Sequence, residues 1–296
     1  MDDIKRKCFF CSEKIDGKVS LEHIIPNSLL GTLGLKNEKL NGDISLEYSR
    51  IKVPSHGSCN NEFGSTYESK VLELLSEPQK LYEELRLANN GNEMMTGPCS
   101  SSVKIISTWM QKIHYGFLYN DLIKNTSVER KEIATSILND SNFKLLQESY
   151  RMNLGFNLPS SLYVFKAKKN HFNLCNIISP QVLMIKIENL IFILCIADGH
   201  LAQNYLTGSV LEKLENYVDK EEIKNMAFPK EDYLLGEILA LLNCIPKSSK
   251  FIIGNDQIIN MSFSTMVSNP DEYYKIDEEK LDVVRKEIME SLGIII

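Results

Sequence analysis

Two motifs near the start of the sequence, Cys8-x-x-Cys11 and His56-x-x-Cys59, decide how this part of the chain folds. Each spacing lets one tight turn direct two soft ligand atoms at a single ion, so the four residues predict a zinc site. Closing the loop between the two pairs costs an entropy that grows only logarithmically with its length. A small module can therefore be folded largely by its metal. A redox pair at Cys8 and Cys11 would need a βαβ setting, which this stretch lacks.

Between the two pairs lies Glu22-His23, inside a run that predicts a short strand from Ser20 and is stopped by Pro26. Glutamate offers the hard oxygen that Mg²⁺ or Mn²⁺ prefers. A histidine with an ordinary pKa of about 6.5 can take a proton from water at neutral pH. Neighbours on a regular strand face opposite ways, so both reach one phosphate only if the strand is irregular or the substrate crosses its edge. The pair also fits a solvated strand end.

Asn60 and Asn61 directly follow the last of the four soft ligands and open a predicted helix that continues to Leu75. Asparagine is a good helix N-cap. The positive end of the helix dipole and a side-chain oxygen can also both face a metal-bound phosphate. One asparagine can therefore be a cap or spacer while the other is a ligand.

In this order, the motifs resemble the HNH endonuclease family, whose ββα-metal fold binds one catalytic divalent ion. The resemblance covers roughly the first seventy residues. It implies that Glu22 is the acidic metal ligand, that His23 is the general base that activates water, and that Asn60 is the terminal metal ligand, with Asn61 as the fallback. It further implies Mg²⁺ or Mn²⁺ beside the structural zinc, and hydrolysis of a phosphodiester that leaves a 5′-phosphate.

The sequence departs from the family at two positions. His56 stands where a fourth cysteine is usual, which is harmless because Cys₃His is an ordinary zinc set. The family's middle asparagine, which orients the catalytic histidine, would fall at Ile51. Asn37, Asn41 or a backbone carbonyl would have to replace it. The alternative is a catalytically decayed, zinc-anchored module that binds nucleic acid or protein.

The whole chain has 296 residues, of which 43% are hydrophobic and 24% charged, as in a soluble globular protein with room for two domains. We expect no membrane span, because no apolar run approaches the length that a bilayer requires. The N-terminal residues lack the apolar core of a signal peptide. With scattered remaining cysteines, these features predict a cytoplasmic protein.

The charge distribution is unusual for a nuclease. The net charge is −6, and residues 1–70 hold ten Lys or Arg and ten Asp or Glu, so the whole excess lies in residues 71–296. Affinity for nucleic acid comes mainly from counterion release, so a monomer should bind weakly. We expect the affinity for nucleic acid to come from a local basic patch at Lys5–Lys7 with Lys36 and Lys39, or else from a homodimer or a partner protein. We expect DNA rather than RNA as the substrate. The expected biological setting is a phage-defence or restriction system.

Loop signals at residues 89–98 place a boundary between an HNH module, residues 1–90, and an α+β accessory domain, residues 91–296. This domain should combine helices with antiparallel strands, and would select the target, bind a partner or form an oligomer. In a further alternative, it is the working part of an interaction protein. The expected helices are 103–117, 128–138, 210–217, 233–242 and 277–293, and the expected strands are 162–165 with hairpins at 182–196 and 250–263.

Overall fold

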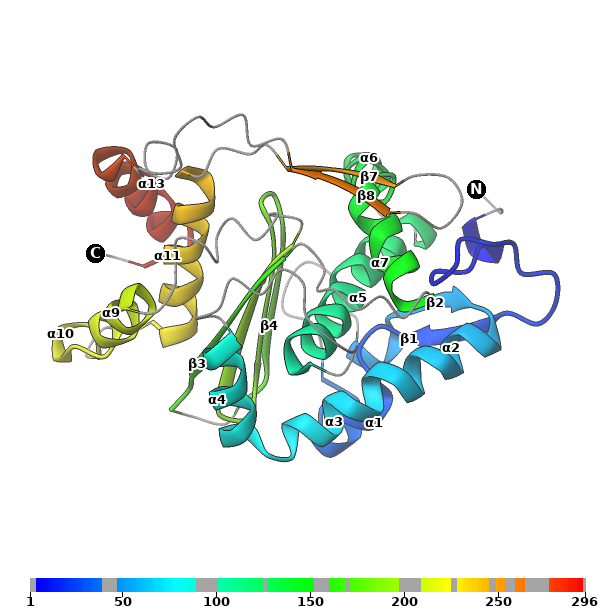
Figure 1. Cartoon of the computed structure of the whole chain (residues 1–296), viewed down its shortest axis with the longest axis horizontal. Helices are drawn as coiled ribbons and strands as arrows, with labels where there is room; N and C mark the ends of the chain where they lie inside the picture. The colour runs from blue at the N-terminus through cyan, green and yellow to red at the C-terminus, as the bar shows by residue number, and fades with distance from the viewer. Residues whose placement is uncertain are drawn as a thin grey trace. The chain divides into compact units, whose positions relative to one another are not determined.

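The computed structural model is an α+β fold (Figure 1). The chain forms two compact units, Met1–Ser76 with Gly97–Leu158, and Glu77–Thr96 with Pro159–Ile296. The structure describes residues 4–38, 47–88, 101–124, 127–151, 160–168, 171–196, 209–224, 228–244, 249–253, 259–263 and 277–294. Lys39, Asn41 and the predicted loop at 89–98 lie outside the described residues.

The first unit is built on a two-stranded hairpin followed by a helix. Strand β1 (Ser20–His23) pairs antiparallel with β2 (Lys52–Ser55), so that His23 lies opposite Lys52. Helix α2 (Gly57–Phe63) continues through the π-helical turn η3 (Gly64–Glu68) into α3 (Ser69–Leu75). The other elements of this unit are η1 (Ile4–Arg6), α1 (Asn27–Thr32), η2 (Tyr48–Arg50), α5 (Ser102–Ile123), α6 (Val128–Leu138) and α7 (Ser141–Arg151).

Helix α2 begins earlier than the sequence predicted. Its first residue is Gly57, and His56 occupies the N-cap position with an extended backbone. The backbone N–H of Asn60 already donates to the His56 carbonyl at 3.0 Å. Neither Asn60 nor Asn61 is therefore the N-cap, and the side chain of Asn60 projects from the end of the first helical turn.

Helix α5 extends beyond the predicted 103–117 at its C-terminal end and packs within the first unit. The Ser101 side chain caps it by accepting a hydrogen bond from the Lys104 backbone N–H. The helix contacts β2, η3, α3, α6 and α7. Its residues therefore belong with the N-terminal hairpin, so the packing units differ from the predicted bounds of 1–90 and 91–296. No helix among the described residues is long and apolar enough to cross a membrane.

One glycine allows α5 to approach the end of β1. A Cβ atom at Gly116 would lie 2.9 Å from Cγ1 and 3.0 Å from Cγ2 of Ile24, which is fully buried just after β1. Such distances are shorter than ordinary van der Waals contact, so only glycine fits here. Lys112 lies one turn earlier on the same face of α5.

The second unit contains an antiparallel sheet in the order β3-β6-β5-β4. The predicted hairpin is confirmed, because β5 and β6 pair across the turn at Glu188 and Asn189 and form the middle of the sheet. The strands of this sheet are β3 (Ser161–Lys166), β4 (Asn173–Ile178), β5 (Gln181–Ile187) and β6 (Leu190–Cys195). The second predicted hairpin is also present, as β7 (Ser249–Ile253) paired with β8 (Ile259–Phe263).

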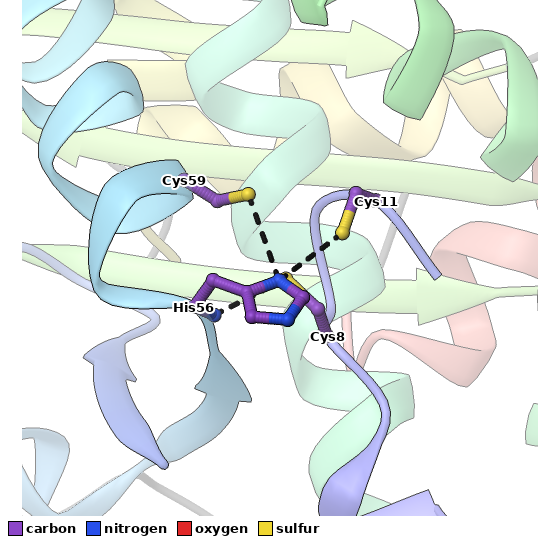
Figure 2. A group of neighbouring side chains, drawn as sticks. All are labelled: Cys8, Cys11, His56 and Cys59. Carbon is purple, nitrogen blue, oxygen red and sulfur yellow. Dashed lines mark hydrogen bonds between the residues drawn. The ribbon is translucent and has the colours of Figure 1, made fainter. Parts of the chain in front are cut away.

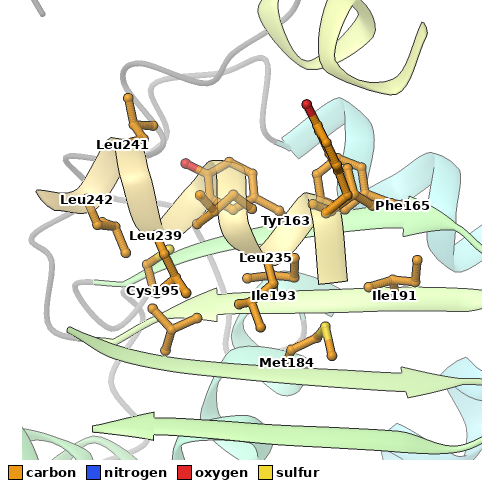
Figure 3. Close-up of a cluster of buried hydrophobic side chains, with 14 of the residues drawn as sticks. Tyr163, Phe165, Met184, Ile191, Ile193, Cys195, Leu235, Leu239, Leu241 and Leu242 are labelled. Atoms are coloured by element: carbon orange, nitrogen blue, oxygen red, sulfur yellow. The ribbon is translucent and has the colours of Figure 1, made fainter. Parts of the chain in front are cut away.

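Helix α11 (Lys230–Cys244) lies along the sheet and buries its apolar face there (Figure 3). Leu235 and Leu239 of this helix pack in one cluster with Met184, Ile191 and Ile193 of the sheet. Among the described residues, the remaining helices of this unit are α4 (Pro78–Ala88), α9 (Ser209–Val218), α10 (Glu221–Lys224) and α13 (Glu278–Ser291). Pro78 begins α4. The predicted helix 277–293 is present as α13, with Asp277 as its N-cap and Gly293 following it at a positive φ of 75°.

Beside this core, the second unit buries a charged pair. Lys186 of β5 donates to Glu231 of α11 at 2.9 Å, and their side chains are 4% and 3% exposed. His171 adds a second contact to Glu231, with its Nε2 atom 3.1 Å from the same carboxylate oxygen. Charges removed from water require such partners, so the pair fixes how α11 lies on β5.

The close approach at Gly116 predicts that Gly116→Ala destabilises the first unit by about 1 kcal/mol net. Alanine gains roughly 1 kcal/mol of helix propensity over glycine, but overpacking a dense core costs about 1–3 kcal/mol. Gly64→Ala in η3 is the matched control, because a Cβ there meets nothing within 4 Å. The fluorescence of Trp109, the chain's single tryptophan and a residue of α5, reports unfolding of this unit in denaturant. Equal stability of the two variants would contradict the close packing.

Candidate functional site

The predicted zinc ligands are brought together by a tight turn and a helix start. Cys8 and Cys11 lie in a loop closed by a bridge between Lys7 and Lys14. Within this loop, the Ser12 backbone N–H donates to the Cys8 carbonyl at 2.9 Å, and Ser12 takes a positive φ of 62°. This turn directs both sulfur atoms to one side.

His56 and Cys59 supply the other half of the cluster, at the start of α2 (Figure 2). The ligand atoms of all four residues lie within 4.8 Å of one another. The Nδ1 atom of His56 is 3.3 Å from the Cys11 sulfur and 3.9 Å from the Cys59 sulfur. Bonds of about 2.3 Å to sulfur and 2.0 Å to nitrogen give a tetrahedral N···S edge of roughly 3.5 Å. The set can hold a metal ion, and its chemistry fits zinc.

The other ring nitrogen of His56 supports this arrangement. Its Nε2 atom lies 3.2 Å from the carbonyl oxygen of Lys14, so an Nε2–H group would donate to that carbonyl. That tautomer leaves a lone pair on Nδ1, which faces the sulfur atoms. Metal-binding histidines are commonly oriented by such a hydrogen bond.

Without a cation, the Cys11 thiol would hold its proton. Burial raises the pKa of Cys11 to about 12, and the neighbouring Cys8 and Cys59 thiols add to the rise, against a lowering by the backbone at Glu13. A divalent ion reverses this preference because thiolates are its ligands, so binding releases protons.

The cysteine loop also rests on a core of aromatic side chains. Phe10 stacks on Phe63 of α2 at 5.0 Å between ring centroids, and Phe63 stacks on Tyr67 at the same distance. Phe9 packs against Tyr119 of α5 and Phe143 of α7, both at 5.5 Å. Apolar contacts with α5 and α7 therefore stabilise the N-terminal module beside the cluster that can hold a metal ion.

Glu22 faces the interior of the first unit, and its side chain is 8% exposed. Its Oε1 atom lies 2.6 Å from Nζ of Lys112 of α5. The same Nζ lies 2.8 Å from Oε1 of Glu68, at the end of η3. Burial raises the pKa of the Glu22 carboxyl and Glu68 adds to the rise, whereas Lys112 opposes it. The cation that Glu22 contacts in the structure is thus a lysine.

His23 is half-buried at the end of β1, and successive residues of a strand face opposite sides. Desolvation lowers the pKa of its imidazole below the ordinary value, and Lys52, Lys112 and Lys36 lower it further, against an opposing effect of Glu68. The ring is therefore neutral at pH 7 and can accept a proton.

Asn60 lies beside β1, and its Nδ2 atom donates to the Ser20 hydroxyl at 3.3 Å. Ser20 and Glu22 alternate with Leu21, so Asn60 and Glu22 lie toward the same face of the strand. Asn61 is exposed on α2. The structure thus places Asn60 closer than Asn61 to the side of β1 that carries Glu22.

The position of the family's middle asparagine carries no polar group. Ile51 is buried with 1% exposure, and Asn37 is exposed after α1. Within the described residues, no hydrogen bond joins Asn37 to the His23 ring. The polar contact at this strand end is made instead to the backbone, where Lys112 donates to the His23 carbonyl.

Two residues of this network, Lys112 and Glu68, were not identified from the sequence. The sequence signals that could have pointed to Lys112 were its place inside a predominantly apolar helix and the glycine four residues later, Gly116. Neither signal shows which strand the helix would meet. The other histidine on this helix, His114, is fully buried and packs against Tyr115.

Neither a protein-family model, nor a curated protein, nor a solved structure matches this chain. The function must therefore be inferred from the residues of the site themselves.

The cluster predicts one zinc ion per chain and a loss of stability when a ligand is removed. We expect Cys59→Ala to lower the zinc content strongly and to destabilise the first unit by at least about 4 kcal/mol, as is typical when a structural metal is lost. Metal content is measured by elemental analysis and stability by Trp109 fluorescence. The control is Cys175→Ala, which alters a half-buried cysteine of the second unit. Full zinc content in Cys59→Ala would exclude this ligand set.

Proposed function

We propose that the chain is a metal-dependent HNH endonuclease that hydrolyses phosphodiester bonds, in DNA rather than RNA. The observation that carries the proposal is the order of elements around the cysteine and histidine cluster. A hairpin bearing Glu22 and His23 is followed, directly after His56, by a helix that carries both Cys59 and Asn60. The family resemblance assigns a role to each of these side chains. The expected phage-defence or restriction setting stays a prediction.

The donor atoms near β1 suit a catalytic Mg²⁺ or Mn²⁺ ion. Glu22 would supply a carboxylate oxygen and Asn60 an amide oxygen, both hard ligands. A carboxylate accepts at two oxygens, and the Lys112 contact uses Oε1 of Glu22. A bound ion would neutralise charge on the phosphate and on the leaving oxygen.

His23 would act as the general base on this proposal. Its lowered pKa keeps the imidazole neutral at pH 7, so it can take a proton from water as the oxygen attacks phosphorus. The bond from phosphorus to the 3′ oxygen then breaks, which leaves a 5′-phosphate and a 3′-hydroxyl group. Lys52, which pairs with His23 across the hairpin, would supply a positive charge to a phosphate beside the imidazole.

Two observations favour the alternative of a decayed binding module. The Glu22 carboxylate already has a buried counter-ion in Lys112, and the middle asparagine is replaced by the buried Ile51. Such a module would retain zinc and bind nucleic acid or protein without cleaving it.

The cleavage rate of the His23→Ala variant distinguishes the endonuclease proposal from the binding-module alternative. We expect His23→Ala to retain its zinc and its fold, because His23 is not a ligand of the cluster. Its rate should fall by about 10²- to 10⁴-fold, the usual contribution of a general base. Plasmid, linear and single-stranded DNA and RNA are tested with Mg²⁺ and with Mn²⁺.

The matched control is His171→Ala, which alters a half-exposed histidine of the second unit and should cleave as the wild type does. A wild type that cuts no substrate faster than His23→Ala would overturn the endonuclease proposal and leave the binding module.

A further inference from the structure

We infer that Lys112 and Glu68 are positioning residues that hold Glu22 in place to bind the catalytic divalent ion. This inference rests on the proposed function and extends it beyond the motif, to helix α5 and the turn η3. Lys112 lies outside the first seventy residues, which carry the resemblance to the HNH family, and Glu68 is not one of the residues to which that resemblance assigns a role.

The geometry around Lys112 carries the inference. Its side chain is 1% exposed, and four oxygen atoms lie within hydrogen-bonding reach of Nζ. Two are the carboxylate oxygens of Glu22 and Glu68 at 2.6 and 2.8 Å. The others are the carbonyl oxygens of His23 and, at 3.0 Å, Ile24. One ammonium group thus contacts a proposed metal ligand and the backbone of the proposed base.

The surrounding packing keeps the ammonium group at this point. Gly116, one turn later on α5, allows the helix to approach Ile24, as its missing Cβ shows. The Phe63 ring lies 5.7 Å from Nζ on another side and offers a cation–π contact. A lysine so enclosed cannot leave at low cost, because its charge would lose every partner.

The charge balance indicates that Lys112 orients Glu22 and does not take the place of the divalent ion. Two carboxylates face one ammonium group, so the three charges sum to −1 when all are ionised. A site with this excess still attracts a cation. Lys112 also binds two backbone carbonyls, a contact that orients the strand end independently of any metal.

The test measures metal binding apart from activity. Mn²⁺ binding to zinc-loaded protein is followed by electron paramagnetic resonance without nucleic acid, and cleavage is measured separately against Mn²⁺ concentration. We expect Lys112→Met to weaken Mn²⁺ binding and slow cleavage by about 10- to 100-fold, the range for residues that orient a metal ligand. Lys112→Arg keeps the charge and should restore part of the affinity.

A matched control comes from the same helix. Lys104 is also buried on α5, two turns earlier, so Lys104→Met tests whether loss of any buried lysine there has the same effect. We expect it to leave Mn²⁺ affinity within about twofold of the wild type. Zinc content and the Trp109 unfolding transition show whether each variant is folded.

If Lys112→Met does not fold, a variant of Glu68 tests the same inference. Glu68→Gln should weaken Mn²⁺ binding less than Lys112→Met does. The double variant Lys112→Met with Glu68→Gln removes one charge of each sign. Its fold-loss of Mn²⁺ affinity should be smaller than the product of the two single-variant losses, because both residues act through one network.

Three outcomes would overturn the inference. If Lys112→Met binds Mn²⁺ more tightly than the wild type, Lys112 competes with the ion. If every Lys112 and Glu68 variant retains wild-type affinity in a cleaving enzyme, the network is structural only and the endonuclease proposal stands. If the wild type neither binds Mn²⁺ nor cleaves, the proposed function fails as well.

Discussion

A buried ammonium group must find oxygen partners, and at Lys112 this requirement joins three segments that are distant in sequence. Removing an ion from water costs several kcal/mol even after the surroundings relax, so the charge is tolerated only where partners surround it. Here they come from β1 and from η3, while the lysine itself comes from α5. The orientation of β1 in the first unit is thereby fixed at the end that carries Glu22 and His23.

The cysteine and histidine cluster applies a second constraint to the same hairpin. It ties the loop before β1 to the residues that join β2 to α2. Through Phe9 and Phe10, that loop also shares a core with α2, α5 and α7. The hairpin is thus held at one end by the cluster and at the other by the Lys112 network. Two constraints at opposite ends leave a short strand pair little freedom to shift register.

The sequence predicted those features that depend on local spacing. The four soft ligands, the hairpin around Glu188 and the approximate bounds of α13 each depend on a few neighbouring residues. The start of α2 was misplaced because asparagine is a favoured cap, whereas ligand placement by His56 sets the boundary. Strand β4 was not predicted, because it is a half-exposed edge strand without a clear alternation.

The partner of Glu22 could not be predicted for a different reason. Glu22 and Lys112 are 90 residues apart, and no periodicity in either segment refers to the other. The predicted helix contains two lysines, Lys104 and Lys112, and a solvated position explains each of them equally well at the level of sequence. Only the close packing at Gly116 turns Lys112 toward β1. A pattern can therefore identify the type of ligand, whereas the charges around it depend on tertiary packing.

The two sides of β1 are electrostatically different, and this bears on how a substrate would bind. On the interior side, Glu22 and Glu68 outnumber Lys112. Around His23, the influence of Lys52 and Lys36 is positive. A cation is attracted to the first side and a phosphate to the second, so a phosphodiester lying across the strand end would meet both. On the endonuclease proposal, Glu22 and His23 need not reach the same atom although neighbours on a strand face opposite ways, because Glu22 would bind the ion and His23 would activate the attacking water.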